Sequence, residues 1–298
     1  MKDNRLFLVL LLLLSGLGML NAQNLLETLE QEHTDDPLYT LASFKATRIA
    51  IGQSVETRKK GVLEWHLMNR FWNIPTGRTQ SFLADRLSVR FALEYGISDR
   101  LTFGMGGTTW DGIFDGFLKY RLVRQRMDKK GSPISITVFQ NGSYRSDSYP
   151  SITTGDNFKN RLSFTSQVMI ARKFNPNFSL QFTPSFVHRG GLLFPEDTQN
   201  HFVLGLGGRY KLGNHVSVVS EYHYVTNPIE SADTYDAFAI GVNWEISDVI
   251  LQFHMTNARS MAESAFLTQT FNNFNTEDGN FHFGFNFTYV LHFNKKKK

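Results

Sequence analysis

The sequence predicts an all-β protein, an antiparallel transmembrane β-barrel of about 12 strands, and three observations lead to this fold class. The chain begins with an export signal, alternating segments follow from about residue 61, and the links between these segments alternate between short and long. The segments have nearly the length that a tilted strand needs to cross a bilayer. A soluble all-β protein is the alternative, but it would have to bury every aromatic row between two sheets.

The first residues have the order of a secretory signal peptide. Lys2 and Arg5 precede an unbroken apolar run over residues 6–14, and small residues follow as far as Ala22. This run is shorter than the roughly 20 residues that a spanning helix needs. We therefore expect a signal peptide over residues 1–22, cleaved near Ala22, and export to the cell outer membrane. The chain has no cysteine, which excludes disulfide bonds and lipid attachment through a cysteine.

The composition fits a chain of many strands. It contains 27 Phe and 23 Gly but only 8 Pro, and its hydrophobic content is an ordinary 41%. After the signal peptide no apolar run approaches the length of a transmembrane helix. The net charge of +4 equals the contribution of the basic tail, residues 295–298, so nothing indicates a nucleic-acid surface.

Residues 23–45 are polar and acidic and are predicted to form a short periplasmic segment, and residues 46–294 are predicted to contain the barrel. In the segment from Leu87 to Tyr95, every second residue is apolar and faces one side of a strand. The same alternation predicts strands at residues 61–72, 87–95, 101–109, 117–123, 133–141, 162–170, 178–186, 202–212, 216–224, 238–246, 249–257 and 281–293.

The links between these strands alternate in length. Short turns are expected at residues 98–100, 127–131, 175–177, 213–214 and 247–248, and longer links at 73–85, 146–158, 190–200, 227–235 and 261–280. Short periplasmic turns and longer extracellular loops are typical of outer-membrane barrels. Residues 46–57 leave an alternative open. They give 14 strands if a further strand from 38–45 joins them, and otherwise they lie across the barrel mouth or plug it.

If the apolar rows face lipid, the alternate residues face the lumen. The predicted lumen-facing polar residues are Glu64, His66, Arg70, Arg90, Glu94, Lys119, Arg121, Arg209, Lys211, Glu221, His223, Glu245, His254 and His282. In the closing segment, FHFGFNFTYVLHF, the inward row is His282, Asn286, Thr288 and His292. Charges of both signs in a narrow barrel would pair. We favour a salt-bridged, partly filled interior over a small pore whose slight basic excess selects anions.

Sequence FHMTN, residues 253–257, raises an enzymatic alternative. It resembles the His-x-Ser-Asn motif of outer-membrane phospholipases and lipid A deacylases, with Thr256 in the place of the serine and His254 as its base. Both side chains would point inward, whereas those enzymes act on lipid from the outer surface, so we predict no enzyme. The histidines are spread over several strands without an HxH or HxxxH pair, and we expect no metal site and no cofactor.

Several stretches resemble a Bacteroidota family of β-barrel proteins known only as a domain of unknown function. They are DGFLKYRLVRQ (115–125), MIARKFN (169–175), SLQFTPSFVHR (179–189), GGRYKL (207–212) and LQFHMTNARSMAESAFLTQT (251–270) through FHFGFNF (281–287). The resemblance extends from about Phe44 to Tyr289. It implies a barrel in the outer membrane and supplies no activity, substrate or catalytic residue. The chain departs from the family at its end, where LHFNKKKK follows the last strand.

From these observations we expect a non-enzymatic outer-membrane protein of uncharacterised role, with a narrow channel for small solutes or ions as the leading function. The alternatives are a lipid acyl hydrolase using His254 and Thr256, and a closed barrel that scaffolds periplasmic or surface partners. The expected partners are outer-membrane lipid and the barrel-assembly machinery. No specific protein partner is predicted.

Overall fold

A computed structural model describes residues 37–72, 85–128, 131–146, 157–192, 194, 196–273 and 281–293. The predicted signal peptide, most of the predicted periplasmic segment and the basic tail lie outside these ranges. The compact unit from Tyr39 onward contains the barrel and is described by itself. No helix among the described residues is long and apolar enough to cross a membrane.

Twelve antiparallel strands make up this unit, one for each predicted segment. They are β1 (Val62–Trp72), β2 (Arg86–Gly96), β3 (Leu101–Thr108), β4 (Ile113–Val123), β5 (Ser135–Arg145), β6 (Leu162–Lys173), β7 (Phe178–Arg189), β8 (Asn200–Lys211), β9 (Val216–Val225), β10 (Ala237–Ile246), β11 (Val249–Thr256) and β12 (His282–His292). A 3₁₀ turn, η1 (Lys159–Arg161), precedes β6, and the helix α2 (Glu263–Thr268) lies between β11 and β12.

Each strand pairs with its neighbour in the chain, and β12 pairs with β1 to close the barrel. At this seam Trp65 of β1 lies opposite Tyr289 of β12. The prediction of a closed 12-strand barrel is confirmed, and the alternative of 14 strands is wrong. Residues 46–57 form a single isolated bridge, between Arg48 and Gln53, and join no strand of the barrel.

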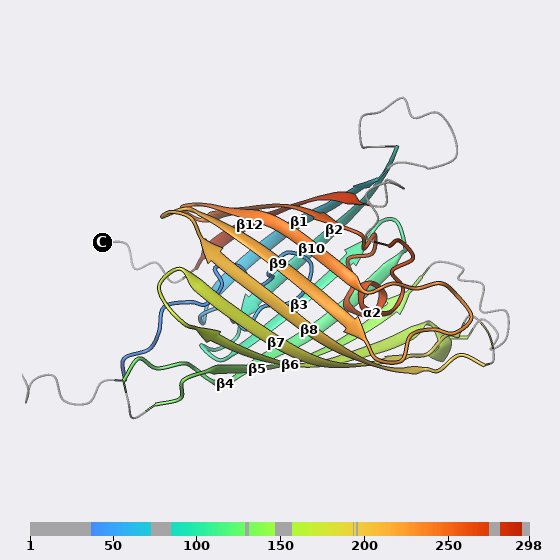
Figure 1. The fold of residues 1–298 in the computed structure, drawn as a ribbon, viewed down its shortest axis with the longest axis horizontal. Helices are drawn as coiled ribbons and strands as arrows, with labels where there is room; N and C mark the ends of the chain where they lie inside the picture. Colours follow the sequence, from blue (N-terminus) through green and yellow to red (C-terminus); the bar gives the residue numbers. More distant parts are fainter. Residues whose placement is uncertain are drawn as a thin grey trace, which may run out of the picture. The chain divides into compact units, whose positions relative to one another are not determined.

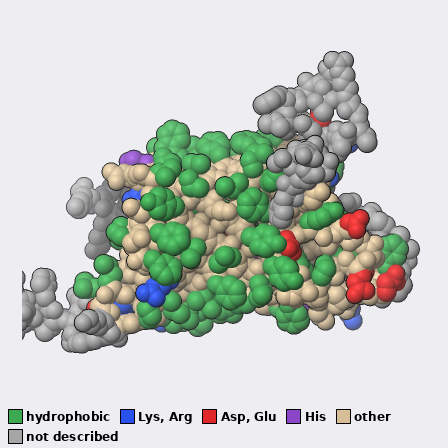
Figure 2. All heavy atoms as spheres, in the orientation of Figure 1, with side chains coloured by type: hydrophobic (Ala, Val, Ile, Leu, Met, Phe, Trp, Pro, Cys, Tyr) green, Lys and Arg blue, Asp and Glu red, His purple; other side chains and the backbone are tan. Residues whose placement is uncertain are grey.

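The alternation of each strand separates two environments. Outward side chains such as Phe91 and Leu206 are 51% and 56% exposed, whereas the inward side chains of Arg70 and Arg90 are completely buried. Figure 2 shows hydrophobic side chains spread over the strands of the face in view, with charged side chains towards the two ends. A broad apolar outer surface on a closed barrel is the arrangement that lipid contact requires.

Two segments occupy the interior of the barrel. One is residues 44–57, which precede β1 and are called the plug below; the other is residues 258–270, which contain α2 and are called the α2 segment. Figure 1 shows the plug in blue among the strands near the end with the short turns, and α2 near the end with the long loops. The link between β11 and β12, predicted as a long extracellular loop, thus begins by folding back into the barrel.

Gly96, at the end of β2, allows the chain to pass from the plug to β1. A methyl group at Gly96 would lie 2.0 Å from the backbone oxygen of Lys59, which cannot turn away as a flexible side chain can. We expect Gly96→Ala to lower the free energy of unfolding by about 1–3 kcal/mol, as overpacking does. Urea unfolding in detergent micelles measures this loss. Gly213→Ala is the matched control, because a methyl group there has no atom within 4 Å, and an equal loss in both variants would contradict the prediction.

Candidate functional site

The plug is a tight hairpin inside the barrel. The N–H of Ser54 donates to the carbonyl of Thr47 at 2.8 Å, and the N–H of Ile49 donates to the carbonyl of Gly52 at 2.9 Å. These two bonds leave most peptide groups of the hairpin without a partner in the plug itself. Unpaired peptide groups are costly in a buried place, so the wall of the barrel has to satisfy them.

Glu221, on β9, binds the tip of this hairpin. Its carboxylate accepts hydrogen bonds from the successive N–H groups of Ala50, Ile51 and Gly52, with N···O distances of 2.9 Å from Ala50 and 3.1 Å from Gly52. Successive N–H groups in a turn form a concave anion-binding surface. Here the anion is a side chain of the barrel wall, and charge-assisted bonds of this kind are stronger than neutral ones.

Lys119, on β4, holds the two arms of the hairpin. Its ammonium group donates to the carbonyl oxygens of Thr47 at 3.1 Å, Ser54 at 3.2 Å and Glu56 at 3.3 Å. An ammonium group has three donors, and all three are used on the backbone of the plug. Glu221 and Lys119 thus satisfy, respectively, the donors of the tip and the acceptors of the arms.

Neutral side chains of further strands complete the attachment of the plug. Gln181 of β7 donates to the carbonyl of Gln53 at 2.8 Å and accepts from the N–H of Val55 at 2.7 Å. Bonds of the same kind come from Thr137 of β5, Asn243 of β10, Gln252 of β11 and Asn286 of β12, and Thr102 of β3 accepts from the N–H of Arg58, just after the plug. Because these contacts come from strands around the barrel, the plug lies across the lumen.

Apolar side chains of the plug form a core with the wall. Phe44, Ile49, Ile51 and Val55 are buried in one cluster with inward residues of several strands. The wall residues of this cluster include Phe117, Phe139, Met169, Val187, Val203 and Val219. Burial of apolar area contributes roughly 25 cal/mol per Å². The plug is therefore held by a hydrophobic core as well as by hydrogen bonds.

The α2 segment fills the interior beyond the plug. Phe266 and Leu267 of α2 are buried in the same apolar cluster as the plug. Arg48 of the plug lies 2.7 Å from Glu263 of α2, and both side chains are almost completely buried. The oxygen of Glu263 also accepts a hydrogen bond of 2.7 Å from Gln53. The two segments therefore contact each other through a buried ion pair as well as through apolar packing.

Ion pairs also link neighbouring positions of the wall. Arg90 of β2 and Asp115 of β4 form a bidentate pair whose side chains are both completely buried. Asn141 of β5 donates a further hydrogen bond of 3.2 Å to Asp115. Arg209 lies 3.2 Å from Glu245 near the end with the short turns. The interior is thus salt-bridged and filled by two segments of the chain.

The structure places all fourteen predicted lumen-facing residues on inward positions of the strands. Eleven are buried, namely Glu64, His66, Arg70, Arg90, Glu94, Lys119, Arg209, Glu221, His223, His254 and His282. Arg121, Lys211 and Glu245 are partly exposed. His292 of the closing strand, also expected to face the lumen, lies opposite the inward residue Val62 of β1, but beyond the buried part of the interior. Its side chain is exposed at the end of the barrel, 3.4 Å from Asp248 of a short turn.

His254 and Thr256 do not form a nucleophile and base pair. The hydroxyl of Thr256 donates to the carbonyl of Phe238 at 2.6 Å, and neither ring nitrogen of His254 has a hydrogen-bond partner among the described residues. A nucleophile would have to donate to its base. The His254 ring lies instead against Gly284 of β12, where an added methyl group would be 2.1 Å from its Nε2.

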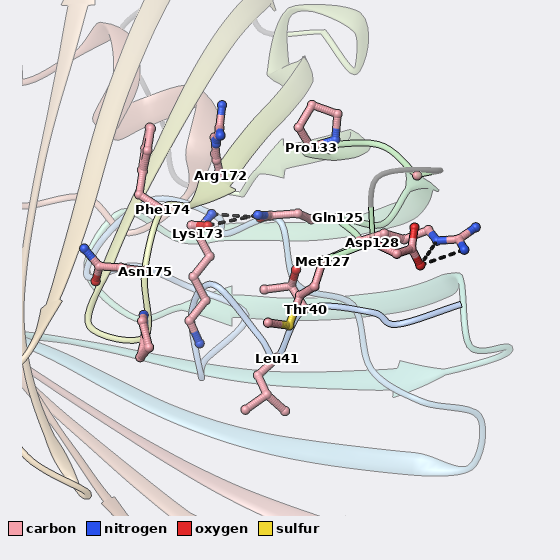
Figure 3. A pocket seen from close by; sticks show the side chains of 13 residues that line it. Thr40, Leu41, Gln125, Met127, Asp128, Pro133, Arg172, Lys173, Phe174 and Asn175 are labelled. Carbon is pink, nitrogen blue, oxygen red and sulfur yellow. Dashed lines mark hydrogen bonds and ion pairs between the residues drawn. The ribbon is translucent and has the colours of Figure 1, made fainter. Parts of the chain in front are cut away.

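An open groove lies at the end of the barrel with the short turns. It has a volume of about 800 Å³ and is lined by Thr40 and Leu41 ahead of the plug and by the turns after β4 and β6. Figure 3 shows the groove, with the side chain of Gln125 joined to the backbone of Lys173 by two hydrogen bonds. None of the buried charged side chains that hold the plug lines this groove. The groove marks where the chain enters the barrel.

At the opposite end, Asp197 joins two of the long loops. Its carboxylate accepts hydrogen bonds from the backbone and the hydroxyl of Ser231, the latter at 2.6 Å, and from the N–H of Phe194 at 3.1 Å. Burial opposes the charge of Asp197, but these hydrogen bonds hold the pKa of its carboxyl below the usual value. The loops after β7 and β9 are thus joined by a charged group at neutral pH.

Sequence reasoning missed several residues of the interior. Asp115, Arg48 and Glu263 were not among the predicted lumen-facing residues, although they form two of the buried ion pairs. Asp115 falls on the inward row of β4 once that strand is extended back to Ile113. Arg48 and Glu263 lie outside the strands, so strand alternation gives no signal for them.

Two solved structures align with most of this chain at low sequence identity. The KdgM porin is 8% identical, with 78% of this chain and 99% of that chain covered and a TM-score of 0.47. An outer membrane channel from Pseudomonas putida F1 is 13% identical, with 79% and 97% covered and a TM-score of 0.43. No curated protein matches the chain. Residues 44–291 match the model of a family described as "Membrane bound beta barrel domain (DUF5777)".

Proposed function

The chain belongs to this family of membrane-bound β-barrel domains, and we propose that it is a non-enzymatic outer-membrane channel for small solutes or ions that is closed by its own plug. In such a barrel the short turns lie in the periplasm, so the plug would close the lumen from the periplasmic side. Twelve strands enclose a narrower lumen than the 16–18 strands of open porins, which limits the solutes to small ones.

One observation carries this proposal. The peptide groups of the plug are bonded to side chains of the wall and not to the strands themselves, so withdrawal of the plug breaks no strand pairing. The wall groups left behind include Glu221, Lys119 and Gln181. All are polar and would be solvated in a water-filled lumen, as the inner faces of channel barrels are.

The charges of the wall do not favour the alternative of a pore that selects anions. Asp115 adds an acidic group to the wall that the sequence prediction lacked. Arg90 and Arg209 are each neutralised by a carboxylate of a nearby strand. We therefore propose passage of small solutes without strong selection by charge sign.

A reversible disulfide between plug and wall tests the proposal. An added Cβ at Gly207 of β8 would lie 3.8 Å from Cγ1 of Ile49, the atom whose place the sulfur of a cysteine takes, so cysteines at the two positions would face each other. The chain has no cysteine, so Ile49→Cys with Gly207→Cys introduces a single pair. We expect channel openings in planar bilayers from the reduced protein and none from the oxidised protein. The single variant Ile49→Cys controls for the reagents.

Two results would overturn the proposal. One is a reduced protein that seals the bilayer at every applied voltage, and the other is a current that oxidation leaves unchanged. Mass spectrometry of the oxidised sample establishes that the disulfide has formed, so that an unchanged current has a single meaning.

A further inference from the structure

A cluster of three titratable side chains at the start of the barrel plays no part in holding the plug. Glu64 and His66 lie on β1, two residues apart, and both point inward. Glu94 of β2 lies directly opposite Glu64 in the register of the hairpin. All three side chains are buried, and one ligand atom from each lies within 4.8 Å of the others.

From this arrangement we propose that Glu64, His66 and Glu94 bind one divalent transition-metal ion, with Zn²⁺ as the best fit. Nε2 of His66 lies 3.4 Å from an oxygen of Glu64 and 3.5 Å from an oxygen of Glu94. Two ligands on Zn²⁺ with bonds of about 2.1 Å at a tetrahedral angle lie roughly 3.4 Å apart. One imidazole and two carboxylates, with a position left for water, is a donor set that zinc accepts.

Unpartnered atoms in the cluster point to a ligand. Oε2 of Glu94, Oε1 of Glu64 and Nε2 of His66 are buried and have no hydrogen-bond partner among the described residues, whereas Oε2 of Glu64 has an ion pair with Arg58. Polar atoms left in this condition are costly, and a bound cation would take one ligand atom from each of the three side chains. Nδ1 of His66 lies 2.9 Å from the hydroxyl of Thr288. A metal-bound histidine typically has such a partner on its second nitrogen.

Arg58 would compete with a metal ion for the carboxylate of Glu64. Its Nε lies 2.8 Å from Glu64, but without the alignment of a hydrogen bond, and its side chain is 16% exposed. Arg58 also lines a cavity of about 590 Å³ at the end of the barrel, together with Val62 and His292. Arg58 therefore lies between this cavity and the carboxylate of Glu64. Arg58 neutralises one of the two carboxylates, and within the described part of the chain Glu94 has an ion pair with His66 but with no arginine or lysine.

Glu221 and His223 have the same spacing as Glu64 and His66, but their carboxylate is not available to a metal ion. Nε2 of His223 lies 3.2 Å from Glu221 on β9, but that carboxylate is occupied by three N–H groups of the plug. Among the residues that the structure describes, only the group of Glu64, His66 and Glu94 brings three such side chains to one point. Glu94, the third side chain of this group, lies beside Glu64 because β2 pairs with β1.

Metal titration of the full-length protein in detergent, after treatment with a chelator, tests this site. We expect calorimetry with Zn²⁺ to show one ion per chain and Co²⁺ to give an absorption spectrum of mixed nitrogen and oxygen ligands. Glu94→Gln and His66→Gln should each weaken binding by at least about tenfold. His201→Gln, a buried histidine of β8 bonded to the carbonyl of Asn227, is the matched control and should bind as the wild type does.

The variant Arg58→Gln distinguishes a metal-binding role of this cluster from a purely structural role. Without the competing guanidinium, we expect tighter binding of Zn²⁺ and a larger rise of the unfolding temperature on adding it. Absence of Zn²⁺ binding by the folded wild type, or unchanged binding by folded Glu94→Gln, would overturn the site. Heat-modified mobility in gels shows whether each variant is folded. The channel experiment uses other residues, so failure of one proposal leaves the other standing.

Discussion

Replacement of the plug, residues 44–57, by a Gly/Ser linker of equal length is expected to raise the current through a barrel that the plug otherwise keeps closed most of the time. The linker can make none of the contacts to Glu221 and Lys119, and it has no side chains to replace Phe44 or Ile51 in the apolar core. Water then enters the lumen, because its remaining wall is rich in polar groups. Conductance of single insertions in planar bilayers measures the effect.

The α2 segment is expected to block part of the current that remains after the plug is replaced. Its ion pair with Arg48 is lost together with the plug, and we expect a flickering current until residues 258–270 are replaced as well. Leu41→Ser serves as the control, because that side chain lies ahead of the plug and is 78% exposed. A barrel that stays sealed with both segments replaced would show that the wall side chains themselves close the lumen.

Asp115→Ala is expected to cause the largest loss of stability of any single change in the wall. The substitution leaves the guanidinium of Arg90 buried without a counterion, since the two side chains are both completely buried and paired with each other. Breaking a buried pair from one side costs about 3–5 kcal/mol. The free energy of unfolding, from urea titration in detergent micelles, measures the loss.

The double variant Arg90→Met with Asp115→Leu is the matched control for this pair. Replacing both charges by apolar side chains of similar size removes the pair without leaving a buried charge, and such replacements are often neutral. We expect the double variant to recover most of the stability that Asp115→Ala loses. A single variant as stable as the wild type would mean that water reaches Arg90 in the interior.

The strands were predictable from the sequence because one physical constraint acts on every second residue. A side chain such as Phe91 faces outward and its neighbour Arg90 faces inward, so the period-two pattern records both the strand and its orientation. The even number of strands follows from barrel closure. The predicted resemblance to a β-barrel family known only as a domain of unknown function and the 12-strand barrel are both confirmed.

The interior could not be predicted to the same extent, because it depends on contacts between distant parts of the chain. Residues 46–57 alternate much as a strand does, and only the contacts with Glu221 and Lys119 make them a plug. The α2 segment has no strand period and was assigned to a loop. Likewise Glu94 becomes a neighbour of Glu64 only through the register of β1 and β2.

The short connection from the plug to β1 determines how a displaced plug would bind again. Only residues 58–61 separate the hairpin from Val62, the first residue of the barrel. A displaced plug would therefore stay near its binding site at an effective concentration on the order of millimolar or higher. A free peptide with the sequence of residues 44–57 would compete poorly against it at micromolar concentration. Reclosure would be intramolecular, and its rate would not depend on how many copies of the protein the membrane holds.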